Sequence, residues 1–313
     1  MSLSADKLVI HPRVREALDG GEPVVAFDST VIAHEIPAPA NLETALAVER
    51  IIDEAGAVPA TIAILEGAIR VGLDEPALRF LATGSGIRKA GERDLPMLIA
   101  QRLTSTATVS AGMAIAAAAG IRVLVTSGIG GVGPDAFRDF DISADLPALA
   151  AHRCLVVCSG AKAFMDIAGT LEVLETLRVP IIGYQTGYFP LFYSPGEAHR
   201  LEWTADTPEA AAAAFAAKLA LGAPGGMLVC VPPPSEAAVP VPVIQAATQT
   251  ALERAREAGV SGKAVTPFVF TAIDAITEGR SIAANIALVR RNAAIGAQIA
   301  RALADHPMAK RRV

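Results

Sequence analysis

The chain has 313 residues, of which 52% are hydrophobic, 19% charged and 4% aromatic, and its formal net charge is −5. This composition excludes a disordered chain, which needs low hydrophobicity and high net charge, and the acidic balance argues against nucleic acid as a partner. Because no stretch reaches ~18 uncharged apolar residues, we expect no membrane span and a cytoplasmic protein.

Short apolar strands and longer helices are predicted to alternate along the chain. Strands are expected at 24–30, 60–66, 122–128, 154–160, 179–186 and 226–232, with a turn between Gly67 and Gly72. Helices are expected at 41–55 (with Asn41 as N-cap), 74–82, 109–119, 143–152, 163–178, 207–220, 241–258, 266–278 and 281–304. Continuous apolar strands indicate a sheet covered on both faces. We therefore predict one domain over 1–313, with an α/β fold of the three-layer α/β/α sandwich type and a mainly parallel central sheet.

Parallel sheets bind ligands at the carboxyl ends of their strands, so the residues that follow each strand are the candidates for chemistry. Asp28 follows the first strand, and His34 and Glu35 come soon after it. Two carboxylates and an imidazole suit acid–base chemistry, although an Asp or Ser here also suits a helix cap. The glycine-rich run 126–133 (TSGIGGVG) offers backbone N–H groups to a phosphate, or forms a tight turn.

Two further segments carry charged side chains suited to a site. Asp139, Asp141 and Asp145 are oxygen ligands of the kind that Mn²⁺ or Mg²⁺ takes, although Ser143 or Asp145 also suits a helix N-cap. Lys162 follows the strand at 154–160, where burial would lower its pKa and leave a nucleophilic amine. A lysine extending from a helix start to solvent is the alternative there. Lys89, in a glycine-containing segment, is a second candidate or a surface charge.

The other reactive and aromatic side chains are interpreted mainly as structural. Cys154, Cys158 and Cys230 are expected to be buried thiols in a reducing compartment. The remaining histidines (His11, His152, His199 and His306) are assigned to the surface or to loops, and Trp203 to packing. Tyr184, Gln185 and Tyr188 follow a strand, where they form either an aromatic-binding wall or part of the core.

Together these motifs resemble the pseudouridine-5′-phosphate glycosidase family, also called the indigoidine synthase A-like proteins. The matching segments include DST…H…P.P.N (28–41), GAVPATIAILEG (56–67), RKAGERDLP (88–96), TSGIGGV (126–132), FDISADL (140–146), CSGAK (158–162) and ANIALVRRNA (284–293). They extend over nearly the whole chain.

The resemblance implies an enzyme that cleaves, or reversibly forms, the carbon–carbon bond between ribose 5-phosphate and uracil. Lys162 would form an imine with ribose C1′, Lys89 would bind substrate, and Asp28 takes the place of the family's proton-donating glutamate. Asp141 matches the position of a divalent metal, Mn²⁺ or Mg²⁺. Substrate contacts are predicted for Lys89, Val109, Thr126, Gly128, Ser143, Ala144, Asp145, His34 and Asn285. The family is typically a homotrimer.

The chain also departs from the family pattern around the predicted site. Glu35 stands where the family has glycine, and Gly133–Pro134 replace a His–Arg pair. These changes remove polar groups suited to uracil, and Phe27, Tyr184, Tyr188 and Phe189 are expected beside the site. Our leading hypothesis is therefore C-ribosylation of an aromatic, polyketide-type aglycone in antibiotic biosynthesis, with Asp28 or Glu35 moving protons. The alternatives are a pseudouridine-5′-phosphate glycosidase and a sugar-phosphate-binding protein without activity.

Overall fold

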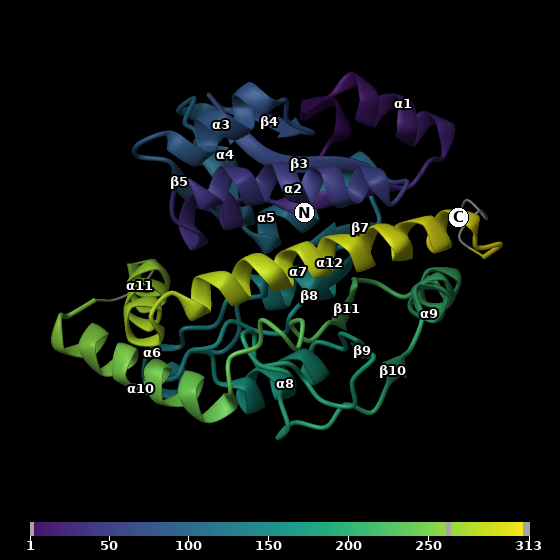
Figure 1. Ribbon diagram of the computed structural model, residues 1–313. Helices are drawn as coiled ribbons and strands as arrows, with labels where there is room; N and C mark the ends of the chain where they lie inside the picture. The colour runs from purple at the N-terminus through teal and green to yellow at the C-terminus, as the bar shows by residue number, and fades with distance from the viewer. Residues whose placement is uncertain (1–2, 261–263, 309–313) are drawn as a thin grey trace.

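A mostly parallel sheet runs through the molecule between two layers of helices (Figure 1). The computed structural model describes residues 3–260 and 264–308, and within them the strand order is β1-β4-β3-β2-β7-β8-β11-β9-β10, with β6 pairing to β3 and β5 to β6. All pairs are parallel except β3 with β4 and β3 with β6. The strands are β1 Leu8–Ile10, β2 Val24–Asp28, β3 Val58–Leu65, β4 Ala68–Val71, β5 Arg88–Ala90, β6 Ser105–Ala107, β7 Val123–Val125, β8 Leu155–Cys158, β9 Ile181–Tyr184, β10 Thr204–Ala205 and β11 Met227–Cys230.

Alternate residues of each buried strand pack on opposite faces, which gives two separate cores. Val25 and Phe27 of β2 belong to one core, and Val24 and Ala26 to the other. The first core is covered by α2 Ala40–Glu54, α3 Glu75–Thr83, α9 Pro208–Ala220, α10 Val241–Glu257, α11 Val265–Thr277 and α12 Arg280–Asp305. The second is covered by α1 Pro12–Gly20, α4 Leu95–Ala100, α5 Val109–Ala119, α7 Asp145–Ala151 and α8 Ile167–Thr176. The predicted α/β/α sandwich is thus confirmed.

The predicted turn between Gly67 and Gly72 is wrong, because residues 68–71 form the strand β4. β3 and β4 form a hairpin in which Leu65 pairs with Ala68. Glu66 and Gly67 both have positive φ (50° and 80°), as a two-residue type I′ turn requires. The glycine at the second position fits this conformation without strain.

Two expected helix starts are also wrong. The helix expected from 163 begins only at Ile167, where the Asp166 side chain caps it by accepting the Gly169 N–H. Residues 160–165 therefore form a loop, and Lys162 lies in it. Asn41 is not the N-cap of α2 but lies buried inside the helix, where its Nδ2 donates to the carbonyls of Ile32 and Ala82.

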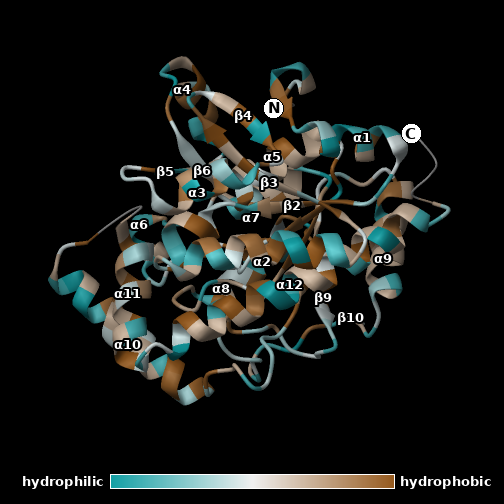
Figure 2. Ribbon diagram, turned by 45° about the horizontal axis from the view of Figure 1, so that its top comes forward, coloured by the Kyte–Doolittle hydropathy of each residue, from teal (hydrophilic) through white to brown (hydrophobic). Residues whose placement is uncertain are grey.

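Small residues bring α12 and α5 close to the sheet. Gly296 of α12 lies against Val125 of β7, and Gly112 of α5 lies against Leu124. Figure 2 shows hydrophobic residues concentrated in the central strands and mixed with hydrophilic ones on outer helices such as α10. The alanine-rich helices therefore serve close helix–sheet packing. No helix in residues 3–260 and 264–308 is long and apolar enough to cross a membrane.

We predict that Gly296→Ala destabilises the protein. A Cβ at this position would collide with Val125 Cγ2, so the core must shift at a cost of about 1–3 kcal/mol. This opposes the gain of about 1 kcal/mol that alanine brings to a helix interior. Urea denaturation measures the free energy of unfolding, with Gly187→Ala as control because nothing lies within 4 Å of a Cβ there. An unfolding free energy at or above that of the wild type would contradict the packing argument.

Candidate active site

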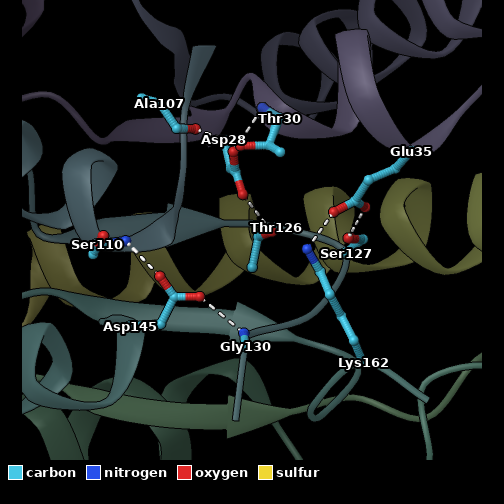
Figure 3. Close-up of polar contacts among 10 residues, drawn as sticks. All are labelled: Asp28, Thr30, Glu35, Ala107, Ser110, Thr126, Ser127, Gly130, Asp145 and Lys162. Atoms are coloured by element: carbon cyan, nitrogen blue, oxygen red, sulfur yellow. Dashed lines mark hydrogen bonds and ion pairs between the residues drawn. The ribbon is translucent and has the colours of Figure 1, made fainter. Parts of the chain in front are cut away.

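The predicted catalytic side chains meet at the carboxyl ends of three adjacent strands (Figure 3). Asp28 ends β2, Thr126 and Ser127 follow β7, and the loop after β8 carries Lys162. Because β2, β7 and β8 are parallel neighbours, residues far apart in the chain reach the same edge of the sheet.

Asp28 is a buried carboxyl group held by two hydrogen bonds. Its Oδ1 accepts the Thr30 N–H at 2.7 Å, and its Oδ2 accepts the Thr126 hydroxyl at 3.0 Å. Burial, followed by the negative charge of Glu35, raises the pKa of Asp28 to about 6, although Thr30 and Lys162 act in the opposite direction. Asp28 is therefore able to give or accept a proton near neutral pH.

Lys162 forms a buried ion pair with Glu35. The distance from Lys162 Nζ to Glu35 Oε1 is 2.6 Å, and the side chains are 9% and 1% exposed. Glu35 Oε2 also accepts the Ser127 hydroxyl at 2.6 Å. Glu35 ends a π-helix, Val31–Glu35, a rare element that occurs often at functional sites.

The pKa of Lys162 differs from the sequence prediction. Burial alone, the largest single effect, lowers this pKa as predicted. The charge and hydrogen bond of Glu35, with the charges of Asp28 and Asp145, outweigh burial and raise the pKa above its ordinary value. Desolvation raises the pKa of Glu35, but the combined effects of Lys162, Ser127 and Lys89 are larger and lower this pKa below its ordinary value. The Glu35 carboxylate is therefore ionised. The resting site therefore holds an ammonium–carboxylate pair instead of a free amine.

Lys89 is the second lysine of the site. It lies on β5 and is half-buried. The positive charge of Lys162, followed by burial, lowers the pKa of Lys89 to about 8, and the carboxylates of Glu35, Asp145 and Asp28 oppose this shift. Its predicted alternative, a surface charge, does not describe this environment.

Asp145 fixes the glycine-rich loop that follows β7. Its Oδ1 accepts the Ser110 N–H at 2.9 Å and its Oδ2 the Gly130 N–H at 2.8 Å, which joins α7 to α5 and to the loop. A Cβ at Gly130 would collide with the Ser143 hydroxyl, so the close approach requires glycine. The Asp145 carboxylate thus has a structural role in this arrangement.

Three cavities meet around these side chains. The main cavity, about 690 Å³, is lined by Asp28, Thr30, Lys89, Thr108, Val109, Ser110, Phe140, Asp141, Ser143, Ala144, Asp145, Lys162, Phe164 and residues of the α10–α11 hairpin. Glu35 and His34 line both a second cavity of about 370 Å³ and a third of about 340 Å³. Lys89 lines the second cavity as well as the main one. Lys162 and Glu35 therefore stand between the main cavity and the other two.

Most of the predicted site residues line the main or the second cavity, and three do not. Asn285 lines the third cavity, where its buried Oδ1 has no hydrogen-bond partner among the described residues. Thr126 is buried behind Asp28, and Gly128 packs against the Phe192 ring. These last two positions shape the site and are not among the residues that line a cavity.

Asp141, the predicted metal position, has an exposed side chain at the main cavity. Its backbone N–H donates to Asp139 Oδ1, and burial followed by the charge of Asp139 raises the pKa of Asp141. Among the described residues, no group of three or more His, Cys, Asp or Glu side chains is placed to hold a metal. A metal ion at Asp141 would therefore have to keep most of its water ligands, as Mg²⁺ commonly does.

The structure decides several predictions about aromatic and histidine side chains. Tyr184 is buried in the core, which was one of its two predicted alternatives. Phe27 and Phe189 are also core residues, and Tyr188 lines none of the three cavities, so the expected aromatic wall beside the site is wrong. Trp203 is 63% exposed and is not a packing residue. His152 is half-buried and has a partner, with its Nε2 2.9 Å from Glu92 Oε2. The three cysteines are buried free thiols, as predicted.

Asn292 of α12 is one of the polar residues at the site that were not predicted from the sequence, as are Ser127, Thr108 and Ser110. It is fully buried, and its Nδ2 donates to the Thr126 carbonyl at 2.9 Å and to the Ser159 hydroxyl at 3.2 Å. It thereby holds the ends of β7 and β8 together. Asn285 and Asn292 are seven residues apart, which places both on one face of the helix, and this spacing was a usable signal.

Similar proteins place this chain in one family. The model of the indigoidine synthase A-like proteins matches residues 13–302. The pseudouridine-5′-phosphate glycosidases of Caldanaerobacter subterraneus and Alkaliphilus metalliredigens are 47% and 48% identical to this chain, each over 93% of it and 95% of their own length. The crystal structure of the prealnumycin C-glycosynthase AlnA, in complex with ribulose 5-phosphate, has a TM-score of 0.87 at 32% identity, with 95% of this chain and 97% of that one covered. An indigoidine synthase A-like protein of Thermotoga maritima has a TM-score of 0.84 at 32% identity, with the same coverage.

The fold and the site define an α/β enzyme with a lysine and carboxyl groups at the carboxyl edge of its sheet. The chain belongs to the indigoidine synthase A-like family, a family of glycosidases and C-glycosynthases, as the sequence motifs indicated.

We predict that Asp28→Asn changes how stability depends on pH. Because the pKa of Asp28 is about 6 instead of the ordinary 3.8, the native state binds a proton that the unfolded chain releases between these values. The contribution of Asp28 to stability therefore falls as the pH rises from about 4 through 6, by about 3 kcal/mol at about 1.4 kcal/mol per pKa unit.

The asparagine variant has no carboxyl group at this position, so its stability relative to the wild type should increase over that pH range. Urea denaturation between pH 4 and 7.5 measures the difference, with the exposed Asp19→Asn on α1 as control. A constant difference between variant and wild type across the range would show that Asp28 does not hold its proton in this way.

Proposed function

We propose that this protein reversibly cleaves pseudouridine 5′-phosphate to uracil and ribose 5-phosphate through an imine between Lys162 and ribose C1′. The observation that carries the proposal is the buried Lys162 amine beside Asp28 at one cavity. The glycosidase relatives, at 47–48% identity over nearly the whole chain, support this reaction over C-ribosylation of an aromatic aglycone.

The main cavity offers a place for the sugar phosphate. Lys89 supplies a positive charge, and the hydroxyl groups of Thr108, Ser110 and Ser143 line the same cavity. Charged and hydroxyl donors of this kind recognise phosphate oxygens. With the phosphate held there, the carbon chain of the sugar extends toward Lys162.

The chemistry explains the need for an amine. A C–C glycosidic bond has no oxygen leaving group, so a pair of carboxyl groups alone does not suffice. In the synthetic direction, Lys162 Nζ condenses with C1′ of open-chain ribose 5-phosphate and releases water. The aglycone carbon then adds to C1′, the C=N electron pair moves to Nζ, and the proton of the aglycone carbon passes to Asp28. Finally the O4′ hydroxyl gives its proton to Nζ, the C1′–Nζ bond breaks to release the Lys162 amine, and O4′ bonds to C1′ to close the sugar ring; cleavage is the reverse.

A divalent ion at Asp141 is a further part of the proposal. The exposed Asp141 carboxylate borders the main cavity, and Asp139 lies two residues away. Mn²⁺ or Mg²⁺ held there, mainly by water, would reduce the charge of the sugar phosphate.

C-ribosylation of an aromatic compound is the second candidate function. Phe140 and Phe164 line the main cavity, and Phe140 is 81% exposed. Gly133 and Pro134 border the same cavity and carry no hydrogen-bonding side chain. These side chains suit a flat apolar ring better than a pyrimidine.

We expect ribose 5-phosphate and borohydride to leave a reduced covalent adduct on Lys162. Peptide mass spectrometry locates the adduct, and Lys162→Ala should abolish both the adduct and turnover. Lys218→Ala is the matched control, because this lysine lies on α9 and bonds the Pro224 carbonyl outside the three cavities. Absence of an adduct on the wild type would refute the proposed imine.

Substrate discrimination separates the two candidate functions. Incubation with pseudouridine 5′-phosphate should release uracil, detected by chromatography, and the reverse reaction should consume uracil. If an electron-rich phenol is ribosylated in place of uracil, the second candidate is correct and the first is wrong.

A further inference from the structure

We propose that Glu35 is the catalytic residue that takes a proton from the Lys162 ammonium and returns it to the oxygen that leaves as water during imine formation. This inference rests on the proposed imine at Lys162 and adds a role for Glu35, the carboxylate paired with that lysine.

The position of Glu35 is fixed by its surroundings. Its side chain is 1% exposed, and Oε1 lies 2.6 Å from Lys162 Nζ. The Ser127 hydroxyl donates to Oε2, so the other oxygen stays directed at the amine (Figure 3). The π-helix that carries Glu35 is held by buried Val31 and Ile32 and by the bond from Asn41 Nδ2 to the Ile32 carbonyl. A carboxylate held at hydrogen-bond distance from the reacting nitrogen meets the geometric requirement for a general base.

The neighbouring charged groups are less suited to accept this proton. Asp28 accepts hydrogen bonds from Thr30 and Thr126, and Asp145 accepts two backbone N–H groups. Lys89 is a cation, and His34 lies near the carbonyl of Arg88 at 3.4 Å. Tyr193 is buried, and its pKa lies well above its ordinary value because of burial and then the charge of Glu35. Among the described ion pairs, Lys162 has one, and it is with Glu35.

The proton transfer balances without a further reactant. Glu35 first accepts a proton from the ammonium and becomes a carboxylic acid, and the Nζ lone pair then forms a bond to the aldehyde carbon C1′. After the proton shift within the carbinolamine, Glu35 gives its proton to the C1′ hydroxyl group. The C–O bond breaks, water leaves, and the nitrogen lone pair forms the C=N bond. Glu35 ends as a carboxylate and is the counter-ion of the protonated imine.

The Phe270 ring supports the same cycle. Lys162 Nζ lies 5.8 Å from the centre of this ring, within reach of a cation–π interaction. The ammonium and the protonated imine carry the same charge, so the ring and Glu35 stabilise the first and last states of the step alike. The neutral amine occurs between these two states, and its formation from the ammonium is the part of the step that needs Glu35 as proton acceptor.

Glu35→Gln tests this role by keeping the shape and removing the base. We expect imine formation with ribose 5-phosphate, trapped by borohydride at timed intervals, to slow by about 10²-fold or more at pH 7, because loss of the proton acceptor outweighs the lower Lys162 pKa that removal of the Glu35 charge brings. The rate in the variant should rise with pH, because Lys162 must then lose its proton to water, while the wild-type rate is flatter. Glu49→Gln is the matched control: this half-buried carboxylate accepts the Thr61 hydroxyl at 2.6 Å and lies outside the three cavities.

Two further variants make the test independent of folding defects. Glu35→Asp keeps the charge but withdraws the carboxylate, and it should slow trapping by about tenfold. Glu35→Ala should recover part of its rate when formate is added. Equal trapping rates for the wild type and either Glu35→Gln or Glu35→Asp would overturn the role of Glu35 and leave the imine standing. A wild type that forms no adduct would refute the imine itself.

Discussion

A lysine buried beneath a sheet edge needs a negative partner, and the pair of Lys162 with Glu35 meets this need. A buried charge without a partner destabilises a protein by several kcal/mol, whereas a well-bonded pair offsets most of that cost. The pair also sets the charge state of its neighbours. The Glu35 carboxylate helps to raise the pKa of Asp28, and the Lys162 ammonium is the main cause of the lowered pKa of Lys89. The pKa values of two neighbouring carboxyl groups are thus shifted in opposite directions, a pattern that commonly marks an acid and a base.

The sheet and α12 supply the rigidity that such a site requires. β2, β7 and β8 bring Asp28, Ser127 and the Lys162 loop to one edge, although they are widely separated in the chain. Asn292 ties the ends of β7 and β8 together from the helix layer, and Gly296 one turn later lets α12 approach β7. A buried polar residue and a glycine inside a helix each reduce the stability of the fold, so stability alone does not explain this arrangement. The arrangement makes sense where strand ends must be held within a fraction of an ångström.

How far the sequence predicts this molecule depends on the length and continuity of each signal. Long apolar runs and periodic helices, such as β3 and α12, are predicted because many residues report on the same element. Three-residue strands such as β5 and β6 carry too little pattern, and the β4 hairpin was concealed by glycines that suggested a turn. The edge position of Asp28 and Lys162 follows from parallel topology alone. Their ionisation does not follow from the topology. The direction of the Lys162 pKa shift depends on Glu35, which is 127 positions away in the chain and contacts Lys162 only in the folded protein.

In the proposed reaction, Lys89 connects phosphate binding to this charge network. With a pKa of about 8, part of the Lys89 population is neutral in the free site above neutral pH. A phosphate dianion beside it favours the ammonium form, so binding of a sugar phosphate draws a proton to Lys89. The Lys162 ammonium opposes this, since like charges repel, and its conversion to a neutral amine relieves the repulsion. The protonation of one lysine by the phosphate and the deprotonation of the other toward Glu35 therefore favour each other. In the proposed reaction the ion pair and the phosphate end of the cavity therefore act as one electrostatic unit, even though they engage different parts of the sugar.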